Sequence, residues 1–255
     1  LPPLQLTQGE MVALLLTRRL VDQLQGTPFQ GAGRAALEKV ALMLPEMVTI
    51  DAQALEREIS FDVQPVRGDQ AVLMQVYGLV MEAMQRHESL HVIYYTANRD
   101  TVTDRVIDPY HLHYYQGAWY TIAYCHMRHE VRIFALDRIR ECEPTGRQFT
   151  VPADFFLDDY LGHSLGIERG SSSHRVVLRF DRDRARWVRE RVWHRSQTVQ
   201  DLQDGGLLLT LEVTGLGEVQ RWLLGFGAHC EVLEPPELRA SVAAEAQALA
   251  HLYET

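Results

Sequence analysis

The feature that most constrains this chain is a change of hydrophobic period near residue 89. Before it, apolar residues recur every three or four positions, and after it come short aromatic and β-branched runs separated by turn residues. The first spacing is that of a helix with one buried face, and the second is that of β-strands. The sequence therefore predicts an α+β chain whose first part is helical.

Residues 1–88 predict a helical bridge. Thr7 and Glu10 have the spacing of a capping box at the start of a first helix. Further helices are expected over 34–44, from Asp51, and over a last segment whose apolar stripe consists of Val72, Leu73, Val76, Leu79, Val80 and Ala83. These segments carry few chemically reactive side chains, so we interpret them as a bridge and packing surface.

Residues 89–150 predict a small, strongly bent β-barrel. An aromatic run over 90–95 is followed by short strands, expected over 102–106, 110–115, 119–125, 131–136 and 139–143. Short strands at this spacing favour a barrel over a sandwich. Pro109 is expected at a strand start or edge, where its missing N–H is tolerated.

The last part of the chain predicts a second α+β domain. A linker with a short helix covers 151–173, and residues 174–255 then alternate in the order β-α-β-β-α-β before a closing helix. Asp204-Gly205-Gly206 is typical of a hairpin turn, and Pro236 suits the first turn of that closing helix. This order is that of a ferredoxin-like fold.

Composition excludes several classes of protein. A formal net charge of −9 argues against a chain that coats nucleic acid with its whole surface. The cysteines are Cys125, Cys142 and Cys230, an odd number without a CxxC pair, which predicts a reducing cytoplasm and no disulfide framework. No apolar run predicts a membrane span. The chain lacks a starting Met, so we expect a fragment of a longer protein.

No catalytic motif is present, so we expect no enzyme activity, no cofactor and no metal. The sequence contains no G-x-S-x-G, no phosphate-binding P-loop and no H-E-x-x-H. His111 and His113 share a strand face, and an HxH pair can bind a metal. A metal-dependent enzyme using these two histidines is therefore kept as a third hypothesis.

Three blocks of the middle part resemble the WYL domain. They are RVIDPYHL at 105–112, GAWYTIA at 117–123 and RIFALDRI at 132–139, in the order and spacing of that family. Thr121 stands where the family has Leu. The last part resembles the WCX-type extension that accompanies WYL domains, through the segments 186–188, 222–227 and 232–238.

This resemblance implies a fold and a function. The WYL domain is a five-stranded SH3- or Sm-like barrel, and many members are bacterial transcription regulators that act as homodimers. An N-terminal winged helix–turn–helix, absent from this chain, is implied to contact promoter DNA. The barrel is implied to bind a negatively charged effector, either single-stranded DNA or RNA or a nucleotide. Several members are tied to DNA damage, other stress or phage defence.

Such an effector requires cations for phosphates and flat groups for bases. We expect its site to be formed by Arg105, Arg132, Arg138, Tyr95, Tyr120 and His111. Adjacent strand residues point to opposite faces, so Tyr120 is assigned to the site and Trp119 to the core, together with Pro109 and Phe134. The alternative for each arginine is an ordinary salt bridge to Asp104, Asp108, Asp137 or Glu130.

Two further readings stay open. A second basic surface is formed by Arg184, Arg186, Arg189 and Arg191, for which solvated helix surface or dimer salt bridges are the alternatives. A WYL accessory module that binds RNA or a protein partner to control an enzyme is the second hypothesis for function.

Overall fold

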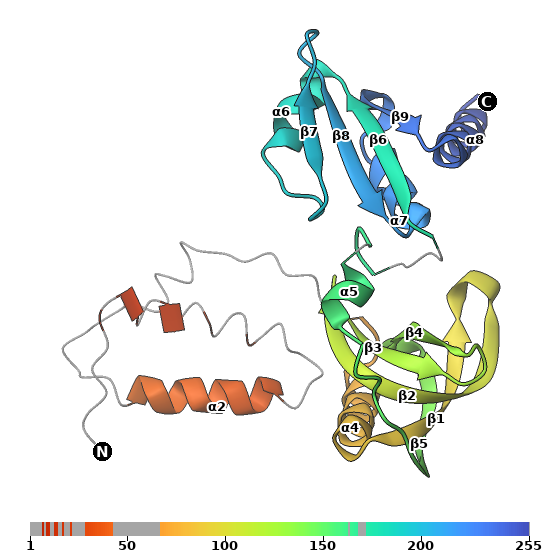
Figure 1. The fold of residues 1–255 in the computed structure, drawn as a ribbon. Coiled ribbons are helices and arrows are strands. Elements are labelled where there is room, and N and C mark those ends of the chain that lie inside the picture. Colours follow the sequence, from red (N-terminus) through yellow and green to blue (C-terminus); the bar gives the residue numbers. More distant parts are fainter. Residues whose placement is uncertain are drawn as a thin grey trace. The chain divides into compact units, whose positions relative to one another are not determined.

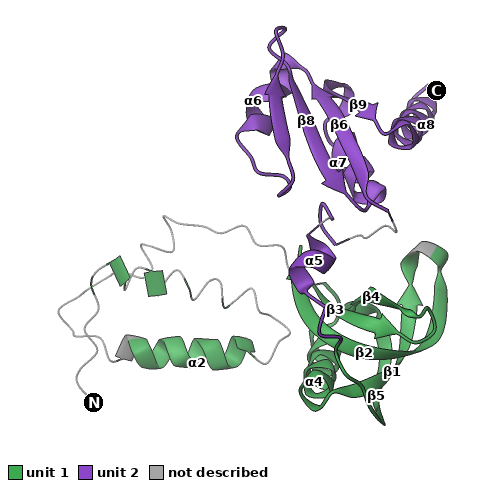
Figure 2. Ribbon diagram, viewed as in Figure 1, with its two compact units in different colours: residues 1–151 green, residues 152–255 purple. Residues whose placement is uncertain are grey.

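The structure is a computed structural model that describes residues 7, 9–10, 13–14, 17, 21, 29–42, 67–162, 164–167 and 172–254. The chain divides into two compact units, residues 1–151 and residues 152–255 (Figure 2). Each unit has a hydrophobic core of its own. Among the described residues, no helix combines the length and the apolar character needed to cross a bilayer.

The helices of unit 1 follow the predicted pattern where they are described. Thr7 and Glu10 form the capping box, since Glu10 N–H donates to Thr7 Oγ1 (3.3 Å) and Thr7 N–H to Glu10 Oε2 (2.7 Å). Helix α2 covers Phe29–Leu42 and helix α4 covers Gln70–Arg86. The helix expected from Asp51 lies outside the described residues.

Helix α4 buries a slightly different stripe from the expected one. Asp69 caps its start by accepting from the N–H groups of Ala71 and Val72. The buried residues are Leu73, Val76, Tyr77, Val80 and Ala83. Val72 is 47% exposed, and Tyr77 belongs to the buried stripe instead. The helix packs on the sheet of unit 1 through this stripe.

The sheet of unit 1 has the strand order β4-β3-β2-β1-β5 and is antiparallel throughout (Figure 1). The strands are β1 Glu88–Thr96, β2 Thr101–Tyr115, β3 Ala118–Cys125, β4 Glu130–Ala135 and β5 Ile139–Gln148. Short 3₁₀ turns, η1 Ala97–Arg99 and η2 Leu136–Arg138, precede β2 and β5. No ladder joins the edge strands β4 and β5, so the described sheet is not closed.

One strand of unit 1 differs from the prediction. The segments expected over 102–106 and 110–115 form a single strand, β2, with a register shift against β3 between Pro109 and His111. Proline has no N–H to donate to a ladder, and such shifts are where a strand bends. The local break in the sequence pattern therefore marks an irregularity within a strand, and the strand continues through it.

Unit 2 has the predicted element order. Its elements are α5 Leu157–Leu161, β6 His174–Phe180, α6 Arg182–Arg189, β7 Thr198–Asp201, β8 Leu207–Val213, α7 Leu216–Leu224, η3 Gly227–His229, β9 Cys230–Glu234 and α8 Pro236–Leu252. The sheet order is β7-β8-β6-β9, all antiparallel. Alternate residues of β6 and β8, among them Phe180 and Leu209, form the core. Gly205 has φ +85° in the turn before β8, a conformation that suits glycine.

Candidate anion-binding site

Residues from three strands of unit 1 meet on the inner face of its sheet, the face that forms the core with α4. Arg105 of β2 lies opposite Val92 of β1. Tyr94 follows Val92 by two residues, so its side chain lies on the same face of the sheet as Arg105. The rings of Tyr94 and Phe134 of β4 pack edge to face with centroids 5.1 Å apart. The backbone N–H of Ala135 donates to the Tyr94 hydroxyl (3.2 Å). Tyr94 therefore links β1 to β4, which are not neighbours in the sheet.

Arg105 is buried between these rings. It is only 7% exposed, and its guanidinium carbon lies 5.9 Å from the Tyr94 ring centroid and 5.8 Å from that of Phe134. Its Nε donates to Thr103 Oγ1 (2.9 Å), and its Nη1 lies 3.6 Å from Cys125 Sγ. The rings and these neutral partners attract the cation but do not neutralise it.

The charge of a second guanidinium, that of Arg138, also acts on Tyr94. Burial raises the pKa of Tyr94, the Ala135 N–H and the charge of Arg138 act against that rise, and the charge of Asp137 adds to it. Arg105 therefore lies over the ring of Tyr94, and Arg138 is close enough for its charge to lower the pKa of the hydroxyl. Two of the predicted cations therefore act on Tyr94, a side chain outside the predicted site.

The carboxylates considered as partners for these arginines are engaged elsewhere. Asp137 accepts from Arg67 (3.0 and 3.2 Å), and Asp104 lies 2.8 Å from His91 Nε2. Within the described ranges, no carboxylate lies within ion-pair distance of Arg105 or Arg138. The carboxylate whose charge acts on Tyr94, that of Asp137, is thus paired with Arg67 and not with Arg105 or Arg138.

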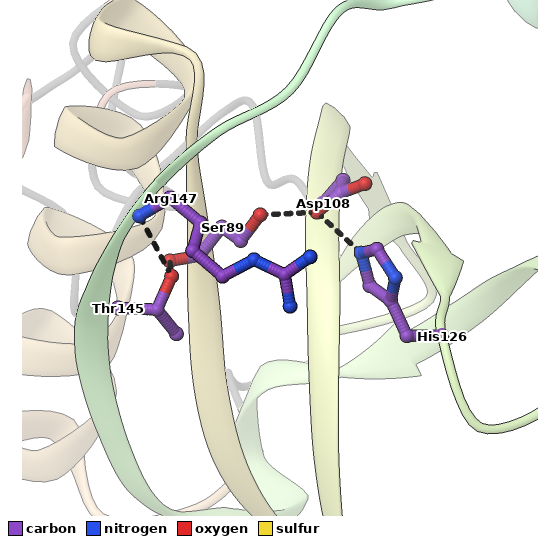
Figure 3. Close-up of polar contacts among 5 residues, drawn as sticks. All are labelled: Ser89, Asp108, His126, Thr145 and Arg147. Atoms are coloured by element: carbon purple, nitrogen blue, oxygen red, sulfur yellow. Dashed lines mark hydrogen bonds and ion pairs between the residues drawn. The ribbon is translucent and has the colours of Figure 1, made fainter.

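The Asp108 carboxylate has hydrogen-bond partners of its own on the opposite face of β2. Its Oδ1 accepts from Ser89 Oγ (2.6 Å) and lies 2.9 Å from His126 Nε2 (Figure 3). In the same view the Arg147 side chain extends across the strand in the direction of Asp108, while its backbone N–H donates to Thr145 Oγ1 (3.2 Å). Ser89 and Asp108 are 2% and 5% exposed. This network joins β1 to β2 and the turn after β3.

Arg132 behaves differently from the other two arginines. It is exposed on the edge strand β4 and forms an ion pair with Glu130 at 2.5 Å. The register places it opposite Ala123, on the same face as Phe134. Its charge is therefore already partnered, as in the salt-bridge alternative.

The other predicted site residues lie on the outer face of the sheet. Tyr95 alternates with Tyr94, donates its hydroxyl to Asp100 (3.0 Å) and lies beneath Arg140, whose guanidinium carbon is 5.2 Å from the ring centroid. Tyr120 pairs with His113 and His111 pairs with Ile122 across β2 and β3. Burial lowers the pKa of both histidines. The structure thus brings Arg105 together with Tyr94 and separates it from these side chains, whereas the charge of Arg138 acts on both Tyr94 and Tyr95.

The residues assigned to the core pack inside unit 1. Phe134 is 2% exposed, and Pro109 is buried. Trp119 is half-buried, with its ring 4.9 Å from that of Tyr77 in α4. Tyr94 was missed because only the pairing of Val92 with Arg105 shows which face of β1 lies beside the buried guanidinium.

The remaining candidates lie apart from this site. Of the described residues, only Asp181, Asp183 and His229 form a group able to hold a metal, so His111 and His113 find no third ligand there. On and after α6, Arg189 pairs with Asp201, while Arg191 lies 4.3 Å from the Trp187 ring centroid. Arg184 and Arg186 are exposed. These four arginines form no converging cluster like that around Tyr94.

Comparison with protein families finds two domains in the chain. The model of the WYL domain matches residues 75–144, and that of the WCX domain matches residues 172–250. The first match begins inside α4 and ends in β5, and so includes Arg105, Arg132 and Arg138. The second covers most of unit 2.

Curated relatives match the whole chain or parts of it. Protein PafC of Mycobacterium leprae is 28% identical, covering 99% of this chain and 74% of the relative. The uncharacterized HTH-type transcriptional regulator YobV of Bacillus subtilis is 26% identical over 86% of this chain and 69% of its own length. The DNA-binding transcriptional repressor CapW of Escherichia coli is 32% identical over 28% of this chain and 24% of its own length.

A solved structure is also similar in sequence. Proteasome accessory factor B/C (PafBC) of Arthrobacter aurescens is 25% identical over 99% of this chain, with a TM-score of 0.35. The chain spans 37% of that protein's length.

Proposed function

Because this chain carries a WYL domain followed by a WCX domain, we propose that it is the effector-sensing part of a bacterial transcription regulator. The proposal includes a homodimer and contact with promoter DNA through a DNA-binding domain of the regulator. The names of YobV and CapW, a transcriptional regulator and a DNA-binding repressor, support it.

The proposal extends to the two folds. We assign the sheet of unit 1 to the SH3- or Sm-like barrels, supported by its five antiparallel strands and by the link from Tyr94 to Ala135 between strands that are not neighbours. We assign unit 2 to the ferredoxin-like folds, supported by the order β7-β8-β6-β9 in a β-α-β-β-α-β chain.

One observation carries the ligand class: Arg105 is buried with no carboxylate beside it among the described residues. Removing a charged group from water costs several kcal/mol unless an opposite charge is supplied. Thr103, Cys125 and two aromatic rings supply none. An anionic ligand shared by Arg105 and Arg138 restores the balance, and phosphate groups of single-stranded nucleic acid or of a nucleotide have the required charge.

Ligand binding at this position can affect regulation through the contacts that Tyr94 and η2 make with the rest of unit 1. Tyr94 receives the Ala135 N–H at the start of η2, and η2 also contacts α4. A ligand anion that binds Arg105 and Arg138 changes the charge around Tyr94 at this junction. The ligand can shift the regulator between two arrangements only if it binds them with different affinity.

The test is a titration of the purified chain with a fluorescent single-stranded DNA oligonucleotide, followed by anisotropy, with a nucleoside monophosphate as competitor. Arg138→Gln should weaken binding about 10- to 100-fold, because a hydrogen bond to a charged group contributes about 1.5–3 kcal/mol. Arg140→Gln is the matched control, since it removes the same charge two residues away, above Tyr95 on the outer face. Equal affinity in the two variants, or no binding by the unmodified chain, contradicts the proposed site.

A further inference from the structure

Three polar side chains on the inner face of unit 1 lack hydrogen-bond partners. They are the hydroxyl of Tyr114, the indole N–H of Trp119 and the hydroxyl of Thr121. All three atoms are shielded from solvent, and no described residue bonds to any of them. Thr121 is 0% exposed as a whole residue.

These side chains are neighbours in the sheet. Tyr114 of β2 and Trp119 of β3 pair directly across the strands, and their ring centroids are 5.2 Å apart. Thr121 follows Trp119 by two residues, so it points to the same face. Buried polar groups without hydrogen-bond partners are rare in folded proteins. One common cause therefore explains three such groups at adjacent positions better than three independent causes.

The position lies where α4 meets the sheet. Tyr77 of α4, 2% exposed, packs edge to face against Trp119 with centroids 4.9 Å apart. Phe134 pairs with Thr121 across β3 and β4, and its ring also packs on Tyr94. The unpartnered groups are therefore separate from Arg105, with the Phe134 ring between Thr121 and the anion-binding site.

The chemistry of the three groups complements one oxygen-bearing molecule. The Trp119 N–H only donates, whereas the Tyr114 and Thr121 hydroxyls both donate and accept. An oxygen that accepts from Trp119 and exchanges hydrogen bonds with the hydroxyls satisfies all three, and buried waters typically make about three such bonds. No charged side chain belongs to the set, so the guest is neutral.

We propose that Tyr114, Trp119 and Thr121 bind a small neutral guest through one oxygen atom, a water molecule or the hydroxyl or carbonyl of a small solute. The guest ties β2 and β3 together beneath α4. The threonine that replaces the usual leucine of the WYL triplet then supplies one of its hydrogen bonds.

The test is Thr121→Val, which removes the hydroxyl and keeps the shape. With a bound guest, the change should lower the midpoint of thermal unfolding by about 2–4 °C, because it breaks a hydrogen bond of the guest. Thr96→Val is the matched control, because its hydroxyl is also buried and unpartnered but lies at the far end of β1. That change should leave the midpoint unchanged or raise it. A higher midpoint for Thr121→Val overturns the proposal, since it means that the hydroxyl was simply unpaired.

A double variant separates a shared guest from independent defects. If Tyr114→Phe and Thr121→Val act on one guest, their combined shift should be smaller than the sum of the single shifts. Additive shifts contradict a shared guest. Native mass spectrometry of the purified chain then distinguishes the sources: an added mass that Thr121→Val removes identifies a solute. If no added mass is found, a magnetisation-transfer signal between water and the Trp119 indole proton identifies the guest as water. The absence of both the added mass and this signal overturns the proposal.

Discussion

The buried Arg105 of unit 1 differs from the surface arginines of unit 2 in its partners. In unit 2, Arg175, Arg179 and Arg239 are about half exposed, and each contacts a carboxylate at 2.5–2.9 Å. In unit 1, Arg105 is 7% exposed and contacts a hydroxyl, a thiol and two rings. Surface pairs of the first kind contribute little, whereas a buried cation without a counter-ion is costly. The capacity of an arginine to bind an added anion therefore depends on its burial and on whether a carboxylate already lies beside it.

The largest expected effect follows from removing the charge of Arg105. Arg105→Met keeps much of the side chain's length but removes the charge, so affinity for single-stranded DNA should fall about 10- to 100-fold. The free energy of unfolding without ligand should be unchanged or higher, because replacing a buried charge by an apolar group removes its desolvation cost. Anisotropy titration and chemical denaturation measure the two quantities. A variant that binds normally, or one that unfolds, rules out the role given to Arg105.

An effect of intermediate size is expected in the pH dependence of stability, because the surroundings of the histidines differ between the two units. Burial lowers the pKa of His111 and His113 in unit 1, and His111 adds to the effect at His113. In unit 2, His174 and His229 lie beside Glu237 and Asp181. A histidine with a depressed pKa in the folded state takes up protons first in the unfolded state. Its contribution to stability is therefore complete above the ordinary value of 6.5 and is lost as the pH falls below it.

We therefore expect unit 1 to lose stability between neutral pH and about pH 5. The double change His111→Gln and His113→Gln should reduce that loss. Calorimetric unfolding at a series of pH values, with His174→Gln as the control in unit 2, measures it. An unchanged pH dependence in the double variant means that these two histidines do not titrate as their burial predicts.

The smallest effect is expected at the surface pairs of unit 2. Arg179 contacts Asp204 at 2.5 Å, and both side chains are about half exposed. Arg179→Met should change the free energy of unfolding by less than about 1 kcal/mol, and the difference should shrink further in high salt. Asp204 keeps its hydrogen bond from the Gly206 N–H (2.9 Å), which limits the loss. A loss as large as several kcal/mol would show that the surface arginines matter to folding and would remove the contrast with Arg105.

Local patterns in the sequence determined most of the elements. The helix α4, the capping box at Thr7 and the β-α-β-β-α-β order of unit 2 each depend on spacing within a few residues. The structure has all three, with Tyr77 in place of Val72 in the buried stripe of α4. The WYL and WCX domains were also recognised from such short blocks. The split of β2 at Pro109 was wrong because a proline interrupts the pattern of a strand without ending it.

Only the tertiary structure decided which cations share a site. Arg132 and Arg138 belong to one sequence block, yet Arg132 pairs with Glu130 whereas the charge of Arg138 acts on Tyr94. The choice of Tyr94 over its neighbour Tyr95 depends on the register between β1 and β2, which shifts every side chain to the other face if it moves by one residue. Periodicity along a chain identifies strands, but the pairing of distant strands determines which side chains meet, because that pairing comes from contacts far apart in sequence.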